Sequence, residues 1–327
     1  MKDIKYIDLF AGIGGFRYGL ERANKQFKCV WSNEWDKYAA QTYRKHYGEI
    51  SEQDIREVKT ADIPEHDLLC AGFPCQSFSV AGKRRGFEDT RGTLFFEIAR
   101  IAKHKRPRYL LLENVKGLLS HDKGKTFQTI IGVLSDLGYR VEWQVLNSKH
   151  FGVPQNRERV FIIGHLGGES GQQVFPIRST DKAVDKTKEL PEQISNTLRT
   201  NYSNAHSNET YVGELEYEGA ILSEENRKWL DDGKEHSRNF PQGQRVYSAE
   251  GVGSTLAGNA GGMGGKTGLY AIHDMRIRRL TPTECERLQG FPDGWTEGLS
   301  DTQRYKCLGN AVTTNVITAI GSQLVDK

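Results

Sequence analysis

The chain has 327 residues, enough for about two domains that each bury a hydrophobic core. Hydrophobic residues at 37% and charged residues at 27% exclude a wholly disordered chain, and the lack of a long apolar run or signal-peptide pattern predicts a cytoplasmic protein without membrane contact. The net charge is only +3, but residues 169–275 hold 11 basic and 16 acidic residues, so the positive excess lies elsewhere and allows a polyanionic partner.

The first half of the chain alternates apolar segments of strand length with segments of helical period. Strands are expected at 4–10, 27–32, 67–71 and 109–114, and helices at 16–23, 93–104 and 126–137. Residues 141–147 and 159–164 are expected to form an antiparallel pair at one sheet edge. The pattern predicts an α/β domain over about 1–166, with a mostly parallel sheet and helices on both faces.

The α/β pattern ends at about Gly167, where the sequence becomes polar and no period of 2 or 3.6 residues persists. Six acidic residues and no Lys or Arg fall between Glu209 and Glu225, and eight glycines fall within 251–268. Such glycines allow positive φ angles and close approach to a ligand, although a flexible surface loop is the alternative interpretation. We therefore expect a smaller inserted domain over 167–275.

Regular structure returns in the last segment, 276–327, which we expect to rejoin the first domain. Thr281 can cap a helix there, with Pro282 at its first position and Glu284 completing a capping box. A final helix is expected from about Ala311 to Leu324.

A glycine turn follows the first predicted strand. Gly12, Gly14 and Gly15 lie between that strand and the next helix, and Glu34 lies at the end of the second strand. This arrangement suits a nucleoside, because glycines expose backbone amides and the carboxylate can accept hydrogen bonds from both ribose hydroxyls. The turn departs from GxGxxG and lacks a pyrophosphate cradle, so S-adenosylmethionine fits better than NAD. Packing alone is the other explanation for the glycines.

Three residues further along could complete a nucleoside site. Trp35 can cover an adenine face, and Asp54 and Ile55 follow a candidate third turn where they can read the adenine edge.

One cysteine differs in context from the other four. Cys75 follows a buried strand in GFPCQSFS, where a loop would expose it as a nucleophile, whereas the others lie in apolar segments. No CxxC pair or zinc spacing occurs, so we expect thiols and no metal site. Glu113 ends the next strand, and neighbouring parallel strands deliver their carboxyl ends to one crevice.

These segments together resemble a known family. DLFAGIGGF, NEWDKYA, GFPCQSFS, TRGTLFFE, ENVKG, QNRERVFIIG and LGNAV occur in the order found in DNA cytosine-5 methyltransferases, of the bacterial or phage type II modification kind. The resemblance implies a Rossmann-like methyltransferase fold with an inserted target recognition domain. It also implies methyl transfer from S-adenosylmethionine to carbon 5 of a cytosine in a short duplex DNA sequence. A monomer in the bacterial cytoplasm or nucleoid, and a cognate restriction endonuclease, are further expectations.

The resemblance assigns roles to particular residues. Cys75 would attack carbon 6, Glu113 would bind or protonate ring N3, and Arg159 would hold the carbonyl oxygen. Arg157 would have a supporting part; since the two arginines alternate along a predicted strand, both are expected on one face. Besides the glycines, Glu34, Trp35, Asp54 and Ile55, the expected cofactor contacts are Phe10, Ile13, Pro74, Leu94, Asn310 and Ala311.

The target cytosine would have to leave the duplex stack before attack. Residues 79–92 would then form a basic lid, and Gln242 would fill the vacated space while Arg245 contacts a base or phosphate. The residues expected to contact DNA are Lys83, Arg84, Arg85, Gln242, Arg245 and Thr255. Three alternatives stay open: a transfer RNA substrate, a DNA-binding regulator without activity, and a nicotinamide dehydrogenase.

Overall fold

The computed structural model describes residues 3–73, 94–167, 173–177, 246–248, 253–258, 267, 269–271 and 277–325. The chain separates into two compact units. The first comprises residues 1–147, 158–179 and 312–327, and the second comprises 148–157 and 180–311. The functional division expected at 167 and 276 stays a prediction. Within the described ranges, no helix is long and apolar enough to cross a membrane.

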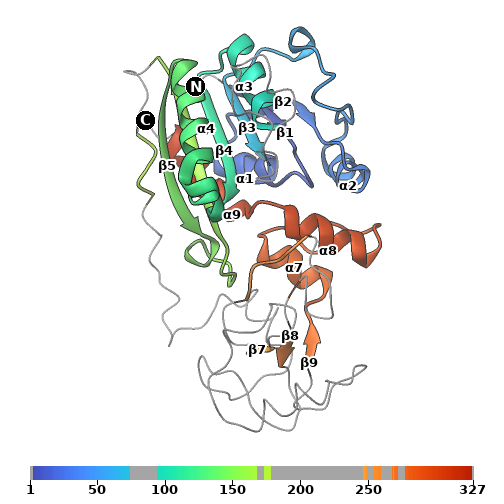
Figure 1. The fold of residues 1–327 in the computed structure, drawn as a ribbon. Helices are drawn as coiled ribbons and strands as arrows, with labels where there is room; N and C mark the ends of the chain where they lie inside the picture. Colours follow the sequence, from blue (N-terminus) through green and yellow to red (C-terminus); the bar gives the residue numbers. More distant parts are fainter. Residues whose placement is uncertain are drawn as a thin grey trace. The chain divides into compact units, whose positions relative to one another are not determined.

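A six-stranded sheet organises the first unit (Figure 1). Its order is β2-β1-β3-β4-β6-β5, with β1 to β4 parallel and β6 antiparallel to both β4 and β5. The bounds are β1 (Ile4–Leu9), β2 (Phe27–Asn33), β3 (Leu68–Gly72), β4 (Tyr109–Val115), β5 (Tyr139–Asn147) and β6 (Glu158–Leu166). The predicted mostly parallel α/β fold and its antiparallel edge pair are thereby confirmed.

Helices cover both faces of this sheet. Helices α3 (Leu94–Lys105) and α4 (Lys125–Asp136) contribute to one large buried cluster, which Ile7 and Leu9 of β1 also enter. Helices α1 (Gly15–Ala23) and α9 (Thr314–Val325) pack together on the other face, where Gly321 of α9 lies beside Phe27 of β2. Helix α2 (Lys37–Tyr47) is capped by Asp36, whose side chain accepts hydrogen bonds from the N–H groups of Tyr38 and Ala39.

The contact between α1 and α9 depends on small residues. A Cβ added at Gly19 would lie 2.5 Å from the Ile317 Cβ, far inside van der Waals contact. The missing side chain lets the Thr318 hydroxyl donate to the Gly19 carbonyl at 3.0 Å. Residues almost the whole chain apart are thus held in one core.

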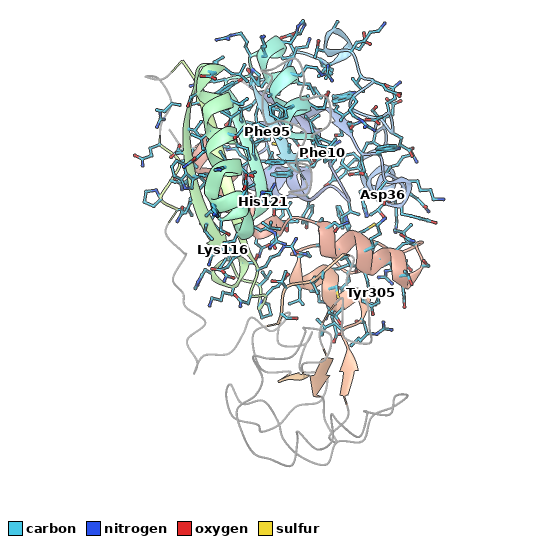
Figure 2. The ribbon with its side chains drawn as sticks, in the orientation of Figure 1. Phe10, Asp36, Phe95, Lys116, His121 and Tyr305 are labelled. Carbon is cyan, nitrogen blue, oxygen red and sulfur yellow. The ribbon has the colours of Figure 1, made fainter. Side chains whose placement is uncertain are left out.

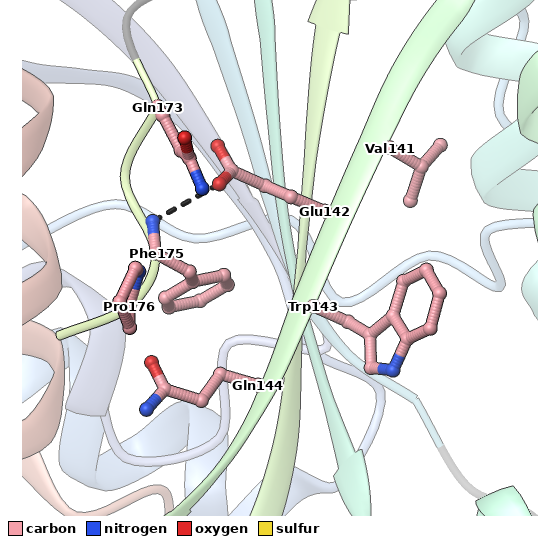
Figure 3. Close-up of a pocket in the computed structure, with 7 residues that line it drawn as sticks. All are labelled: Val141, Glu142, Trp143, Gln144, Gln173, Phe175 and Pro176. Carbon is pink, nitrogen blue, oxygen red and sulfur yellow. Dashed lines mark hydrogen bonds between the residues drawn. The ribbon is translucent and has the colours of Figure 1, made fainter.

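Side chains of the edge strand β5 hold the segment 173–177, which we term the strap. The Glu142 carboxylate accepts the N–H groups of Val174 and Phe175 at 2.9 and 3.0 Å, and Gln144 exchanges two hydrogen bonds with the Ile177 backbone. Figure 3 shows Glu142 and Gln144 pointing toward the strap from one side of β5, with Trp143 on the other. This region forms an open groove lined by Val141, Glu142, Trp143, Gln144, Gln173, Phe175 and Pro176.

The second unit carries a small sheet of order β7-β8-β9, made of β7 (Val246–Ser248), β8 (Leu269–Ala271) and β9 (Ile277–Arg279). Helix α7 (Pro282–Leu288) starts with the predicted capping box of Thr281 and Glu284, which is confirmed.

Short 3-10 helices lie in both units. Three are in the first unit, at Thr60–Asp62, Lys116–Leu119 and His121–Gly124, and one is in the second, at Ser148–His150.

The expected start of the last helix is wrong by three residues. Helix α8 (Asp301–Asn310) was not predicted, and Ala311 is its extended C-cap, so α9 starts only at Thr314. The polar composition of α8 hides its helical period in the sequence.

Candidate active and cofactor site

The turn after β1 has an unusual backbone. Phe10 has a φ of 55°, Gly12 of 57° and Gly14 of 88°, and Gly14 is the N-cap of α1. Phe10 packs against the buried cluster that contains Phe95 (Figure 2). An added Cβ at Gly12 would meet no atom within 4 Å, so open space lies beside this backbone. The predicted cofactor contact Ile13 is buried in the same turn.

Glu34 joins this turn to the end of β2. Its Oε2 accepts the Gly12 N–H at 2.8 Å, and its Oε1 accepts the Asp36 N–H at 2.7 Å. Burial raises the pKa of Glu34, although both backbone hydrogen bonds oppose that effect. Each carboxylate oxygen has about two acceptor positions, so both can still accept from a diol. The predicted glycine and carboxylate pair is therefore brought together here.

Trp35 and Asp54 both contact Arg56, and Ile55 lies between Asp54 and Arg56 in the chain. Trp35 is 64% exposed, and the Arg56 guanidinium lies 5.7 Å from its ring centre. Arg56 also pairs with Asp54, which lowers the pKa of that carboxyl. Ile55 is buried, and its carbonyl accepts a hydrogen bond from Arg100 at 2.9 Å.

Asn33 holds the loop that leads to Asp54, a role that the sequence analysis missed. Its Nδ2 donates to the carbonyls of Ser51 and Gln53 at 3.1 and 2.8 Å. The signal in the sequence was an amide directly before Glu34 at a strand end, where such a side chain can hold a neighbouring loop.

A carboxylate and a guanidinium meet where β4 ends. Arg159 Nε lies 3.0 Å from Glu113 Oε1, and both side chains are largely buried, at 15% and 12% exposure. Arg159 also donates from Nη1 to the Glu158 carbonyl at 2.8 Å. An added Cβ at Gly72 would lie 3.4 Å from Glu113 Oε2, so this carboxylate adjoins the end of β3. Two residues predicted to act on one base are therefore in contact.

Asn114 fixes the chain just after β3 and was also missed. It is 2% exposed, and its Nδ2 donates to the Phe73 carbonyl at 2.7 Å. Phe73 is the last described residue before Pro74 and Cys75. The ENV segment contained the signal, since an amide beside a strand end can bind a neighbouring main chain.

Arg157 lies outside β6, which begins at Glu158, so the two arginines do not share a strand as expected. In the second unit, Arg157 is 2% exposed and donates to the carbonyls of Leu256, Gly309 and Ala311. This geometry suits the supporting role beside Arg159 that the sequence analysis gave to Arg157. Thr255, a predicted DNA contact, donates its hydroxyl to the Asn156 carbonyl at 2.6 Å.

Several predicted site residues lie outside the described part of the chain: Pro74, Cys75, Lys83, Arg84, Arg85, Gln242 and Arg245. Leu94 opens α3 and packs against the large buried cluster. Among the described residues, no group of three or more His, Cys, Asp or Glu side chains has the arrangement of a metal site.

Comparison with known proteins supplies independent information. The family described as C-5 cytosine-specific DNA methylase matches residues 4–326. The chain is 39% identical to the type II methyltransferase M.HhaI of Haemophilus parahaemolyticus, covering 97% of this chain and 93% of that protein. It is 40% identical to M.HpaII of Haemophilus parainfluenzae, over 98% of this chain and 89% of that protein.

Solved structures show the same fold at lower identity. The S. pombe Dnmt2 methyltransferase aligns with a TM-score of 0.68 at 19% identity, covering 99% of this chain and 98% of that one. A Spodoptera frugiperda DNMT2 mutant aligns with a TM-score of 0.71 at 17% identity, covering 98% and 99%.

Proposed function

Because the chain belongs to the C-5 cytosine-specific DNA methylase family and is thus a DNA methyltransferase that uses S-adenosylmethionine, we propose that it methylates one cytosine within a short duplex DNA sequence by base flipping and a covalent Cys75 adduct. The observation that carries this proposal is the Glu113–Arg159 pair, held beside the end of the strand that leads to Cys75.

The described residues fit the cofactor. Glu34 presents a buried carboxylate to the ribose hydroxyls, and the exposed face of Trp35 suits an adenine ring. Open space beside the Gly12 backbone gives the ligand room. Asp54 and Ile55 would read the adenine edge, while Asn310 and Ala311 would support the methionine end. S-adenosylmethionine supplies an electrophilic methyl group when bound.

Cys75 would supply the nucleophile. Carbon 5 of cytosine reacts too weakly with an electrophile by itself, so a thiolate adds to carbon 6 and leaves the ring electron pair at carbon 5. That carbon then takes the methyl group of S-adenosylmethionine, and the sulfur keeps the electron pair of the broken bond, which leaves S-adenosylhomocysteine. Loss of the carbon 5 proton, with water as a suitable acceptor, re-forms the double bond and expels Cys75. Asn114 supports this geometry by fixing the backbone two residues before the thiol.

Glu113 and Arg159 would stabilise the ring during this addition. Glu113 binds or protonates N3, which accepts electron density when the thiolate adds. Arg159 has five N–H donors, and the two contacts described here use Nε and Nη1. The remaining donors suit the cytosine carbonyl oxygen.

DNA binding would use residues mostly beyond the described part. Lys83, Arg84 and Arg85 would close over the duplex, Gln242 would fill the space of the flipped base, and Arg245 would contact a base or phosphate. Thr255 would face the DNA. In this proposal residues 1–166 and 276–327 form the catalytic domain, and residues 167–275 form the domain that recognises the target. The protein acts as a monomer. A restriction endonuclease cutting the same site is the partner that type II relatives suggest.

The test locates the product directly. The protein and its Cys75→Ser variant are incubated with mixed-sequence duplex DNA and S-adenosylmethionine, and 5-methylcytosine is mapped by sequencing. Methylation confined to one short motif and lost in the variant is the expected result. Methylation of structured RNA with none in the duplex would instead identify an RNA enzyme.

A further inference from the structure

A junction of three chain segments surrounds Arg157 in the second unit. The segments are residues 154–157, the loop 253–258, and the turn 309–311 at the end of α8. Arg157 donates from Nη1 to the Leu256 carbonyl at 3.1 Å, and from Nη2 to the carbonyls of Gly309 and Ala311 at 3.2 and 2.8 Å. One buried side chain thus binds both the loop and the turn.

The physical reason for an arginine here lies in the end of α8. The last carbonyls of a helix lack partners within the helix and carry partial negative charge, so a planar cation with several donors suits them. Gln289 contributes in the same way, donating to the Leu308 carbonyl at 2.7 Å. Arg157 differs because it extends this cap to a second segment, the loop 253–258.

The loop 253–258 is also bound along its length to the first segment. The Gly253 N–H donates to the Pro154 carbonyl at 2.6 Å, and the Asn156 N–H donates to the Gly253 carbonyl at 2.8 Å. Gln155, fully buried, accepts the Leu256 N–H and donates to the Leu288 carbonyl. The loop therefore has little freedom to move without the segment that carries Arg157.

Two glycines bring the loop directly against the turn. A Cβ added at Gly309 would lie 2.3 Å from the Gly258 nitrogen, and one added at Gly258 would lie 2.1 Å from Asn310 Oδ1. Even a methyl group at either position would force the loop and the turn apart. Asn310 is thus in contact with the loop that carries Thr255.

We propose that Arg157 is a positioning residue that couples DNA contact by the loop 253–258 to cofactor contact by Asn310. The proposal rests on the proposed function, which gives Thr255 and Asn310 those two roles. Because the loop and the turn share one cap, a ligand that orders either segment lowers the cost of ordering the other. By linkage, DNA raises cofactor affinity by the same factor by which the cofactor raises DNA affinity.

The experiment measures that factor. The Kd of S-adenosylhomocysteine is determined by calorimetry for the full chain, alone and with a duplex carrying the methylated motif. The wild type is expected to bind more tightly by about 5-fold or more when DNA is present. Arg157→Lys keeps the charge but loses the planar guanidinium group that binds three carbonyls. The ratio of its Kd for S-adenosylhomocysteine without DNA to its Kd with DNA is therefore expected to approach 1.

A second variant tests the contact from the opposite side. Gly258→Ala lies in the loop, yet it displaces Asn310 and is expected to weaken S-adenosylhomocysteine binding about 10-fold even without DNA. Two variants are matched controls that should keep wild-type values. Arg287→Lys changes a partly exposed arginine of α7 that pairs with Asp293, and Gly132→Ala adds a Cβ that meets no atom within 4 Å.

The outcomes separate the two proposals. Two results would overturn the coupling while DNA methylation itself persists. One is a wild-type protein whose Kd for S-adenosylhomocysteine is the same with and without DNA. The other is an Arg157→Lys variant with the wild-type ratio of these two Kd values, together with a Gly258→Ala variant of wild-type affinity. A protein that binds no S-adenosylhomocysteine and makes no 5-methylcytosine overturns both.

Discussion

At the scale of single residues, the site is built from buried charges that hold one another in place. Glu113 and Arg159 come from neighbouring antiparallel strands, and their contact needs no loop to position it. Side chains on strands are more precisely placed than those on loops, which matters for a group that meets a ring atom in a transition state. The pair is therefore preorganised before a base arrives.

Removing the charge of Glu113 tests this view. Glu113→Gln keeps the size of the side chain but cannot give a proton to N3, so kcat is expected to fall by about 10²- to 10⁴-fold. Single-turnover methyl transfer with labelled S-adenosylmethionine measures the loss. Glu158→Gln, at the exposed neighbouring position paired with Lys116, is the matched control. A Glu113→Gln rate within threefold of wild type would contradict the assigned role.

Glu142 makes stability depend on pH. The hydrogen bonds from His165, Val174 and Phe175 outweigh the effect of burial and lower its pKa. A carboxyl whose folded pKa is depressed stabilises the protein above its unfolded pKa, and this contribution is lost as pH falls through the folded value.

Glu142→Gln is therefore expected to lower the free energy of unfolding at pH 7 by about 1–3 kcal/mol. The difference from wild type should shrink as the pH falls from about 5 toward 3, because wild-type Glu142 is then protonated as well. Urea unfolding across this range measures it, with exposed Glu49→Gln as the control. A difference that stays constant with pH would show that the carboxylate charge is not involved.

At the scale of elements, α1 and α9 of the first unit pack closely together. Gly19 and Gly321 let α1 and α9 approach until side chains of one touch the backbone of the other. Overpacking at such a contact usually costs about 1–3 kcal/mol, because the helices must separate or the side chains leave their preferred rotamers.

Gly19→Ala is expected to destabilise the protein by that amount, about 1–3 kcal/mol. Gly132→Ala, on the exposed side of α4 with open space around it, should instead stabilise by about 0.5–1 kcal/mol through helix propensity. Chemical denaturation of both variants gives the comparison. Equal effects of the two substitutions would show that helix propensity, and not the contact with Ile317, decides the outcome.

The elements also show what sequence alone can predict. Buried strands such as β3 and β4 were predictable because each contains a short, continuous apolar run of strand length. Helix α8 was not, because its ten residues mix charged and apolar side chains without a clear face. The contacts of Arg157 were not predictable either, because its partners are backbone carbonyls some 99 to 154 positions away, and carbonyls leave no mark in a sequence. Glu113 and Glu34 were predictable because each lies at the carboxyl end of a strand in a mostly parallel sheet.

At the scale of the whole molecule, the cofactor should stabilise the folded chain by mass action. S-adenosylhomocysteine at 100 times its Kd adds about 2.7 kcal/mol, which corresponds to a rise in Tm of roughly 5–10 °C for a unit of this size. NAD at the same concentration should leave Tm unchanged. Differential scanning fluorimetry makes the comparison, and an equal rise with NAD would show that the stabilisation is not specific to S-adenosylhomocysteine.

The pairing of α1 with α9 has a consequence for how the protein is made. The bond from Thr318 to Gly19 spans 299 positions, so a ribosome that adds about 5–20 residues per second releases the second partner roughly 15–60 s after the first. During that interval the nascent chain carries a helix whose buried side, with Phe16 and Leu20, is not yet covered by α9. Because this part of the core closes only when α9 arrives, a prematurely terminated product would keep the α9-binding side of α1 open to water.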